Sequence, residues 1–196
     1  MHLQEKSDIY DVVTFTRKDS IDDLSTLLEG VDWVFHLAGI NRPENLEEFI
    51  TGNTELTEHL CAAIKASGRK IPVVFTSSIQ AKADNKYGST KRAAEDALLA
   101  LRKHNGNPVF IYRLPNVFGK WARPNYNSAV ATFCYNVTRE LPIQINDPSA
   151  VIRLVYVDNV VDSFITLMEG VLQSDTCFDT PYVEVNPEYQ IIVGEL

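Results

Sequence analysis

The chain has 196 residues, of which 45% are hydrophobic and 22% are charged, and its formal net charge is −8. This composition is typical of a globular protein with a substantial core. The negative charge argues against general binding to nucleic acid or to an anionic membrane surface, because either partner requires a basic face on the protein. An anionic small ligand remains compatible with it, since a few local arginines suffice.

Targeting signals and metal-binding patterns are not evident in the sequence. No apolar run approaches the roughly 18 residues that cross a bilayer, and the first residues lack a signal-peptide core, so we expect a cytoplasmic protein without a membrane partner. Three cysteines, Cys61, Cys134 and Cys177, are odd in number and far apart. They fit neither a disulfide framework nor a zinc site, so we expect buried thiols and no metal.

Apolar runs alternate with amphipathic segments along the chain. We expect strands at residues 11–16, 31–37, 71–75, 108–114, 143–145, 151–157 and 189–193. We expect helices at 20–30, at 43–68 with Gly52 as a candidate break, at 92–101, at 128–140 and from Asp158 to Gly170. Strands that are apolar throughout and alternate with helices indicate an α/β fold with a parallel sheet covered on both faces.

The stretch 77–91 carries the residues with the clearest chemistry. Tyr87 and Lys91 are four residues apart at the start of a helix, so they share a face that can point at Ser78, at the end of the preceding strand. A phenol, an ammonium and a hydroxyl at this edge can move a proton to or from a carbinol oxygen. A Tyr-x-x-x-Lys pattern arises by chance about 0.4 times in such a composition, so the context and not the pattern carries the assignment. The alternative is an exposed tyrosine beside a solvated lysine.

Further segments, taken together with this triad, resemble a known family. The segments are His36–Gly39 at a strand end, Asn53 in the next helix, Tyr112–Gly119, and Val155–Val160 at a strand-to-helix junction. They are similar to the extended short-chain dehydrogenase/reductases of the NAD-dependent epimerase/dehydratase family. The resemblance implies a Rossmann-like, doubly wound parallel sheet over residues 1–196. It also implies a single, partial domain whose substrate-binding portion lies in about residues 115–196.

A closer resemblance is to the capsular-polysaccharide UDP-sugar reductases of the CapF/WbjC type. It rests on Gly39–Glu44, Ser77–Ala81, Phe118–Trp121, Pro124–Ser128 and Phe133–Tyr135. It implies NADPH-dependent reduction of a UDP-linked 4-keto-6-deoxy-N-acetylhexosamine in capsular or O-antigen precursor synthesis, and a homodimer for the intact parent. Because the family's first strand, Gly-rich turn and C-terminal cupin have no counterpart in the sequence, we expect a truncated chain.

The resemblance assigns roles to individual residues. The expected catalytic residues are Ser78, Tyr87 and Lys91, with Lys91 tuning the phenol and Ser78 orienting the carbonyl. The expected cofactor-binding residues are Arg17, Leu37, Ala38, Gly39, Thr76, Ser77, Tyr87, Lys91, Leu114, Pro115 and Val117. The expected substrate-binding residues are Ser78, Asn116, Arg123, Asn127 and Arg153.

Cofactor preference is read at the end of the strand 11–16. Arg17 and Lys18 come first there and Asp19 follows. An arginine at this place accommodates the 2′-phosphate of NADPH, whereas a carboxylate binds the ribose hydroxyl of NADH, so we expect NADPH. The alternative is a pair of solvated cations.

Other functions stay open. A nucleotide-sugar 4-epimerase of the same family would use the same triad, and a catalytically inactive fragment would act only as a binding module. A dehydratase needs an Asp-Glu pair directly after the catalytic hydroxyl residue, and Ile79-Gln80 occupies that place, which disfavours it. We expect His36 to be a wall of the pocket or a hydrogen-bonded core residue.

Overall fold

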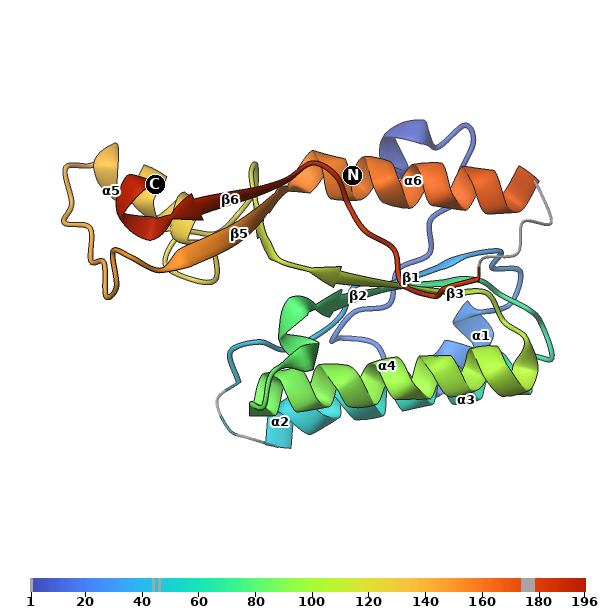
Figure 1. Ribbon diagram of the computed structural model, residues 1–196. Helices are drawn as coiled ribbons and strands as arrows, with labels where there is room; N and C mark the ends of the chain where they lie inside the picture. Colours follow the sequence, from blue (N-terminus) through green and yellow to red (C-terminus); the bar gives the residue numbers. More distant parts are fainter. Residues whose placement is uncertain (1, 44, 46, 174–178) are drawn as a thin grey trace. The chain divides into compact units, whose positions relative to one another are not determined.

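A computed structural model of the chain describes residues 2–43, 45, 47–173 and 179–196 (Figure 1). The chain divides into two compact units, which are residues 1–113 with 177–183 and residues 114–176 with 184–196. In the described part of the chain, each unit contains one three-stranded sheet. The parallel strand pairs and the helices between them make an α/β fold, as the alternating sequence pattern predicts.

The first unit is built on a sheet in the order β1-β2-β3. Its strands are β1 (Val34–His36), β2 (Val73–Ser78) and β3 (Val109–Leu114). β1 and β2 are parallel, with His36 paired to Phe75. Beyond β3 the returning segment adds two backbone hydrogen bonds, because Ile111 donates to Pro181 at 2.7 Å and Val183 donates to Ile111 at 3.0 Å. These contacts extend the hydrogen-bonded layer past β3.

The helices of the first unit lie before and between its strands. They are η1 (Gln4–Lys6), η2 (Ile21–Asp23), α1 (Leu24–Leu27), α2 (Glu47–Phe49), η3 (Ile50–Glu55), α3 (Leu56–Ala66), η4 (Ile79–Lys82) and α4 (Lys86–Asn105). Among the described residues, side chains cap three of them, η2, η4 and α4. Ser20 forms a capping box with Asp23 at η2. Gly106, with a φ of 73°, ends α4 in the left-handed conformation that glycine adopts without strain.

The break expected near Gly52 is a π-helical segment. η3 lies between α2 and α3 and contains Gly52. A β-carbon on Gly52 would meet Ile40 Cδ1 at 2.4 Å, so the glycine lets Ile40 pack against the helix. The helix expected from residue 43 is first seen as α2, from Glu47, while Glu44 lies outside the described residues.

Two expected strands are wrong. Residues 11–16 and 143–145 form no strand in the structure, and Val13 is 54% exposed while Ile143 is 39% exposed. β-branched residues favour extended backbone, but a strand also needs a neighbouring chain for its hydrogen bonds. These segments have no such ladder in the described part of the chain. Propensity therefore overestimated the sheet at both places.

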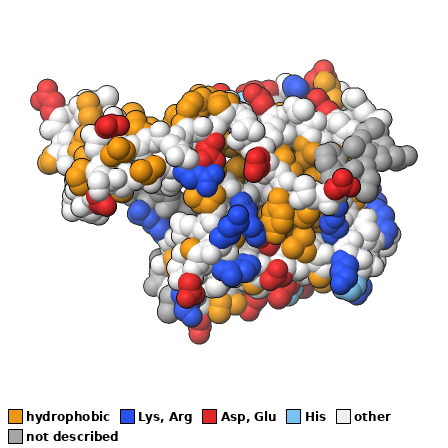
Figure 2. Space-filling view, in the orientation of Figure 1, with side chains coloured by type: hydrophobic (Ala, Val, Ile, Leu, Met, Phe, Trp, Pro, Cys, Tyr) orange, Lys and Arg blue, Asp and Glu red, His pale blue; other side chains and the backbone are white. Residues whose placement is uncertain are grey.

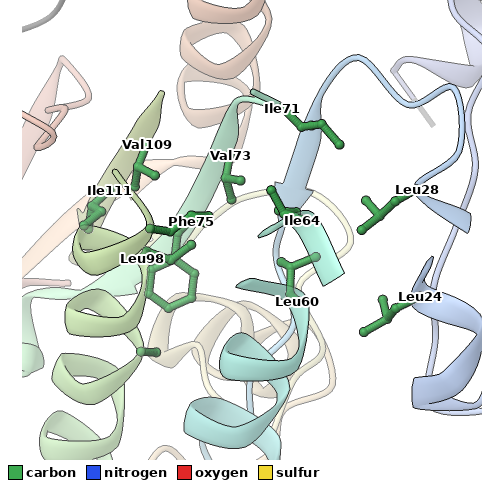
Figure 3. Close-up of a cluster of buried hydrophobic side chains, with 12 residues drawn as sticks. Leu24, Leu28, Leu60, Ile64, Ile71, Val73, Phe75, Leu98, Val109 and Ile111 are labelled. Carbon is green, nitrogen blue, oxygen red and sulfur yellow. The ribbon is translucent and has the colours of Figure 1, made fainter. Parts of the chain in front are cut away.

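A single hydrophobic cluster fills one side of the first sheet (Figure 3). Its buried residues come from α1 and its C-terminal end, from α3, from α4 and from β2 and β3: Leu24, Leu28, Leu60, Ile64, Ile71, Val73, Phe75, Ala94, Leu98, Leu101, Val109 and Ile111. The close-up shows these side chains pointing toward one another from the helices and the strands. Alternate strand residues thus supply the core face, as the period of a strand requires.

In its described residues, the second unit contains a mixed three-stranded sheet, two α-helices and one 3-10 helix. Its elements are β4 (Asn116–Phe118), α5 (Ala129–Val137), β5 (Val151–Tyr156), α6 (Val157–Gln173), β6 (Glu188–Ile192) and η5 (Val193–Glu195). β4 and β5 are parallel, whereas β5 and β6 are antiparallel, so the sheet is not parallel throughout. α6 begins at Val157 rather than being capped by Asp158, and it continues past Gly170.

The surface and the thiols complete the description. Figure 2 shows cationic and anionic side chains interspersed among hydrophobic ones on the visible face. Within the described ranges, no helix combines the length and the apolar character that crossing a membrane requires, and no cluster of three His, Cys, Asp or Glu side chains could hold a metal ion. Cys61 is partly buried, but Cys134 is exposed, contrary to the expectation of buried thiols; Cys177 lies outside the described residues.

The cluster of Figure 3 yields a stability prediction. Ile64 is 0% exposed at its centre, so Ile64→Ala should lower the free energy of unfolding by about 2–5 kcal/mol through lost contacts and a cavity. Chemical denaturation followed by circular dichroism measures the change. The matched control is Ile9→Ala in the same unit, where the side chain is 66% exposed and the loss should stay within about 0.5 kcal/mol. Equal losses in the two variants would contradict the assignment of the core.

Candidate active site

The turn between β2 and α4 presents the candidate triad. Ser78 ends β2, and its hydroxyl oxygen accepts a hydrogen bond from the Gln80 amide at 3.2 Å, which starts η4. Asn85 caps α4 by accepting from the Gly88 amide at 2.8 Å. A β-carbon on Gly88 would lie 2.1 Å from the Gln80 carbonyl oxygen, so only glycine allows the helix to approach the turn this closely. The neighbouring residue, Tyr87, is thereby fixed in place.

The structure brings Tyr87 and Ser78 together. The ring centroid of Tyr87 lies 6.0 Å from that of Phe49. Burial raises the pKa of the Tyr87 phenol, and the side chain of Ser78 opposes this rise. Tyr87 and Ser78 therefore lie close together within one unit of the fold, and their catalytic roles stay predictions.

Lys91 lies one helical turn after Tyr87 and is only 4% exposed. Its Nζ donates a hydrogen bond to the Thr76 carbonyl oxygen at 3.0 Å and sits 4.8 Å from the centroid of the Phe75 ring. Burial lowers the pKa of Lys91 to about 8, and the negative charge of Glu95 opposes this change. The amine is therefore poised near neutral pH in a largely apolar surrounding.

A glycine and an asparagine shape the space beside Lys91. A β-carbon on Gly39 would lie 2.7 Å from Lys91 Nζ and 2.9 Å from Asn53 Oδ1, so the absent side chain makes room for both groups. Asn53 Oδ1 accepts from the Ile40 amide and Asn53 Nδ2 donates to the Ile40 carbonyl, each at 2.9 Å. Asn53 Nδ2 also donates to Thr90 Oγ1 at 3.3 Å. The loop after β1 is thus tied to the helix that carries Lys91.

His36 is a hydrogen-bonded core residue. Its Nε2 lies 2.8 Å from Thr57 Oγ1, and that hydroxyl donates its own proton to the Asn53 carbonyl at 2.6 Å. Since Thr57 has one proton to give, we assign the hydrogen of His36 to Nε2. Burial, and next the charge of Lys91, lower the pKa of His36 to about 3, so the imidazole is neutral.

The other predicted cofactor residues of the first unit fall into two groups. Arg17 and the loop residues Leu37, Ala38 and Gly39 are exposed, so they are accessible to a ligand. Ser77 is 5% exposed and donates its hydroxyl proton to Glu95. The side chain of Ser77 is therefore engaged inside the protein, although the prediction placed it at the cofactor.

The remaining predicted ligand residues belong to the second unit. They are Leu114, Pro115, Asn116, Val117, Arg123, Asn127 and Arg153. Asn116 Nδ2 donates to the Arg153 carbonyl at 3.1 Å, and Arg153 Nη2 pairs with Glu188 Oε2 at 2.7 Å. Arg123 lies 5.7 Å from the centroid of the Tyr126 ring. These contacts orient the polar groups, and the substrate roles stay predictions.

A mostly apolar pocket of about 370 Å³ also lies in the second unit. Phe118, Gly119 and Pro124 line it from one side, and Val130 and Tyr135 of α5 line it from the other. The loop with the predicted substrate residues therefore borders a hollow, although its polar side chains are not on the pocket wall.

Two residues with hydrogen bonds that connect the elements of the candidate site, Glu95 and Asn53, were not predicted as site residues. Glu95, four residues after Lys91, is 1% exposed and holds both Ser77 and Arg113. Asn53 was noted in a helix but was not assigned to the site. The available signal for Glu95 was a carboxylate three residues before Leu98 and one residue after Ala94 in 92–101, because a charged side chain on an apolar helix face is buried only with partners.

The neutral His36 gives a pH prediction. In the unfolded chain a histidine takes up a proton near pH 6.5, but the folded chain resists it until about pH 3. The folded state is therefore fully favoured above pH 6.5 and loses stability as the pH falls below it, by roughly 1.4 kcal/mol per pH unit at most. Urea denaturation between pH 6.5 and 5 should show this slope, and His36→Gln should flatten it. The exposed control His59→Gln should keep it; an unchanged slope in His36→Gln would refute the neutral assignment.

Comparison with known proteins places this arrangement in a family. The sequence profile of the NAD dependent epimerase/dehydratase family matches residues 3–176. The chain is 56% identical, over 195 residues, to the UDP-2-acetamido-2,6-beta-L-arabino-hexul-4-ose reductase of Pseudomonas aeruginosa strain PA103; the alignment covers 100% of the chain and 51% of the relative. The chain thus spans about half the length of this curated relative.

Two solved structures share the fold. The capsular polysaccharide assembling protein CapF of Staphylococcus aureus aligns with a TM-score of 0.79 and 33% identity, over 98% of the chain and 51% of CapF. The UDP-glucuronic acid 4-epimerase of Bacillus cereus, in complex with NAD, aligns with a TM-score of 0.77 and 20% identity, over 95% of the chain and 65% of the epimerase. The epimerase supports the fold alone. The chain belongs to the NAD dependent epimerase/dehydratase family and has its Rossmann-like α/β fold.

Proposed function

We propose that this chain carries the proton-transfer site of an NADPH-dependent reductase. The proposed substrate is a UDP-linked 4-keto-6-deoxy-N-acetylhexosamine, in the synthesis of capsular or O-antigen precursors. The observation that carries the proposal is that Tyr87 lies beside Ser78, whose side chain acts on the pKa of the phenol, one helical turn before the buried Lys91. The name of the Pseudomonas relative, a reductase of a UDP-linked hexulose, and that of CapF support the substrate class.

The chemistry follows from the roles of three side chains. A bound nicotinamide supplies the hydride to the ketone carbon. The Ser78 hydroxyl orients the carbonyl oxygen, and the Tyr87 phenol gives its proton to that oxygen as negative charge develops on it. Lys91, as an ammonium, stabilises the phenolate that remains. Burial raises the pKa of Tyr87 and the Ser78 side chain opposes this rise, so we expect the ammonium of Lys91 to contribute further stabilisation of the phenolate.

The residues beside Lys91 fit a dinucleotide. An ammonium has three donors, and among the described residues Lys91 gives one of them to a protein acceptor, the Thr76 carbonyl. The remaining donors suit the hydroxyls of the nicotinamide ribose. The exposed loop Leu37–Gly39 follows β1 and ends at the glycine that makes room for Lys91. These features support binding of the cofactor at the end of the first sheet.

NADPH is proposed over NADH because of the turn after residue 16. Asp19 Oδ2 accepts hydrogen bonds from the Thr16 amide at 2.6 Å and from Thr16 Oγ1 at 2.8 Å. The carboxylate is therefore engaged in its own turn, while Arg17 is exposed. An exposed guanidinium suits the 2′-phosphate. We also propose that the protein acts in the cytoplasm, as a homodimer in the intact enzyme.

The first test of the function is Tyr87→Phe. The assay follows oxidation of NADPH with the 4-keto sugar nucleotide, using this chain and the chain extended to the length of its curated relative. Removing the acidic proton should lower the turnover rate by about 10²- to 10⁴-fold and leave NADPH affinity, measured by calorimetry, nearly unchanged. Tyr10→Phe serves as the control and should retain turnover.

Three outcomes of that assay would count against the proposal. Near-normal turnover in Tyr87→Phe would remove Tyr87 from its role. Interconversion of two sugar nucleotides without net consumption of NADPH would indicate a 4-epimerase. Binding of sugar nucleotide or cofactor with no turnover in either length of the protein would indicate a binding module.

The second test addresses the cofactor. Arg17→Asp should weaken NADPH binding by about tenfold or more, since a charge-assisted contact is lost and a repulsion is added, and should leave NADH binding unchanged. Calorimetric titration with both cofactors measures the ratio. Lys103→Asp makes the same charge change at an exposed place on α4 and should alter neither affinity. A loss that is equal for both cofactors would show that Arg17 does not contact the 2′-phosphate.

A further inference from the structure

Glu95 is a buried carboxylate to which the proposed reaction gives no role. It lies on α4, four residues after Lys91, and is 1% exposed. A carboxylate in the protein interior is costly unless hydrogen bonds and an opposite charge compensate it. The hydrogen-bond and ion-pair partners of Glu95 therefore indicate the role of its carboxylate.

Glu95 joins three elements at the edge of the first sheet. The Ser77 hydroxyl, at the end of β2, donates to Glu95 Oε1. Arg113 of β3 donates from Nε to Oε1 at 3.0 Å and to Oε2 at 3.1 Å, and its Nη2 also donates to Oε2. Such a forked contact fixes direction as well as distance. The ends of β2 and β3 are thus held against the helix that carries Lys91.

The contact with Ser77 bears on the catalytic serine. Consecutive side chains of a strand point to opposite faces. Ser77 points to Glu95 and Ser78 points to Tyr87. Fixing the first hydroxyl on one face therefore fixes the direction of the second on the other face.

Arg113 anchors the network at its outer end. Its Nη2 donates to the Tyr182 hydroxyl at 3.2 Å, and its guanidinium carbon lies 4.4 Å from the centroid of that ring. Arg113 is 24% exposed by side chain, whereas the side chain of Glu95 is 1% exposed. Arg113 is therefore partly hydrated, whereas the carboxylate of Glu95 is buried in the protein interior.

Few charged groups face Lys91. Among the described residues, Glu95 comes from its own helix, the neutral His36 from β1, and the Phe75 ring and the Thr76 carbonyl from β2. Burial acts against the ammonium form, and Glu95 is the negative charge that acts for it. The amine would lose its proton more readily without that carboxylate.

We propose that Glu95 is a positioning residue of the candidate active site, which holds the end of β2 through Ser77 and places a carboxylate one helical turn from Lys91. The meaning for catalysis rests on the proposed reductase function. The effects of Glu95 on Ser77 and on Lys91 do not rest on that function, because both can be observed without cofactor or substrate.

The test measures the titration of Lys91 directly in the purified chain. Lysine is labelled with ¹³C at Cε, the Lys91 resonance is assigned with Lys91→Arg, and its chemical shift is followed with pH by NMR. Glu95→Gln keeps the shape of the side chain and its ability to accept from Ser77, but removes the charge. The midpoint for Lys91, near pH 8 in the parent chain, should fall by about one pH unit. Asp96→Asn, the same change at the next and exposed position, should leave it in place.

Companion variants separate charge from contact. Ser77→Ala removes the hydroxyl and keeps the carboxylate, so the Lys91 midpoint should stay while the Ser78 amide resonance shifts. Glu95→Asp keeps the charge, and its midpoint should stay closer to that of the parent chain than to that of Glu95→Gln. If Glu95→Gln does not fold, the test uses Glu95→Asp. A Lys91 midpoint that falls by a full pH unit in Glu95→Asp, although the charge is retained, would overturn the proposal. A folded Glu95→Gln with an unchanged midpoint would overturn it too.

Activity then distinguishes this inference from the proposed function. In the extended chain, Glu95→Gln should shift the alkaline limb of the pH–rate profile to lower pH. The shift should equal the fall of the Lys91 midpoint that NMR measures. A shifted midpoint in a protein without reductase activity would retain the role of Glu95 and remove the reductase. Reductase activity with a shifted midpoint and an unmoved pH–rate profile would overturn the catalytic meaning of Glu95.

Discussion

The first unit depends on burying one ammonium group next to the end of a parallel strand. Removing Lys91 from water is unfavourable, and the surrounding residues compensate for that cost in different ways. The Thr76 carbonyl accepts a hydrogen bond, the Phe75 ring offers its π-face, and Glu95 supplies negative charge. Gly39 contributes by having no side chain, since a β-carbon would occupy the space of the amine. The polar groups at this edge of the sheet therefore stabilise the ammonium of Lys91, which would be unfavourable in the apolar core of the same unit.

The adjacent serines divide structure from chemistry at the end of β2. Ser77 is buried and donates a hydrogen bond to Glu95, whereas Ser78 lies beside the phenol of Tyr87. A strand can do this because its side chains alternate between faces, so that one register serves both purposes. The same hydroxyl chemistry therefore has two uses, and the environment of each residue decides which. The side chain of Ser77 therefore faces the interior, and the predicted role of this residue at the cofactor stays a prediction.

How much the sequence could predict depends on how local each interaction is. The placement of Ser78 at the end of a strand, and of Tyr87 and Lys91 one turn apart on the next helix, follows from local patterns and was therefore accessible from the sequence. The bond of Glu95 to Arg113 spans 18 residues and joins a helix to a strand, so only the assembled fold shows it. The strand expected at residues 11–16 failed for the same reason, because a strand depends on a partner that its own residues do not encode. At Gly52, the sequence indicated a break, but the π-helical form arises from packing against Ile40.

The second unit shows why an ion pair does not disqualify a predicted ligand. Arg153 is paired with Glu188, and their side chains are 47% and 25% exposed. The pair raises the pKa of Arg153 and lowers that of Glu188, mainly through the hydrogen bonds between them. At such exposure water screens both charges, and pairs of this kind contribute about 0–1 kcal/mol. A diphosphate carries more negative charge than a carboxylate and makes stronger bidentate contacts with a guanidinium. The ion pair therefore orients the guanidinium of Arg153, and a role of Arg153 in binding an anionic ligand stays a prediction.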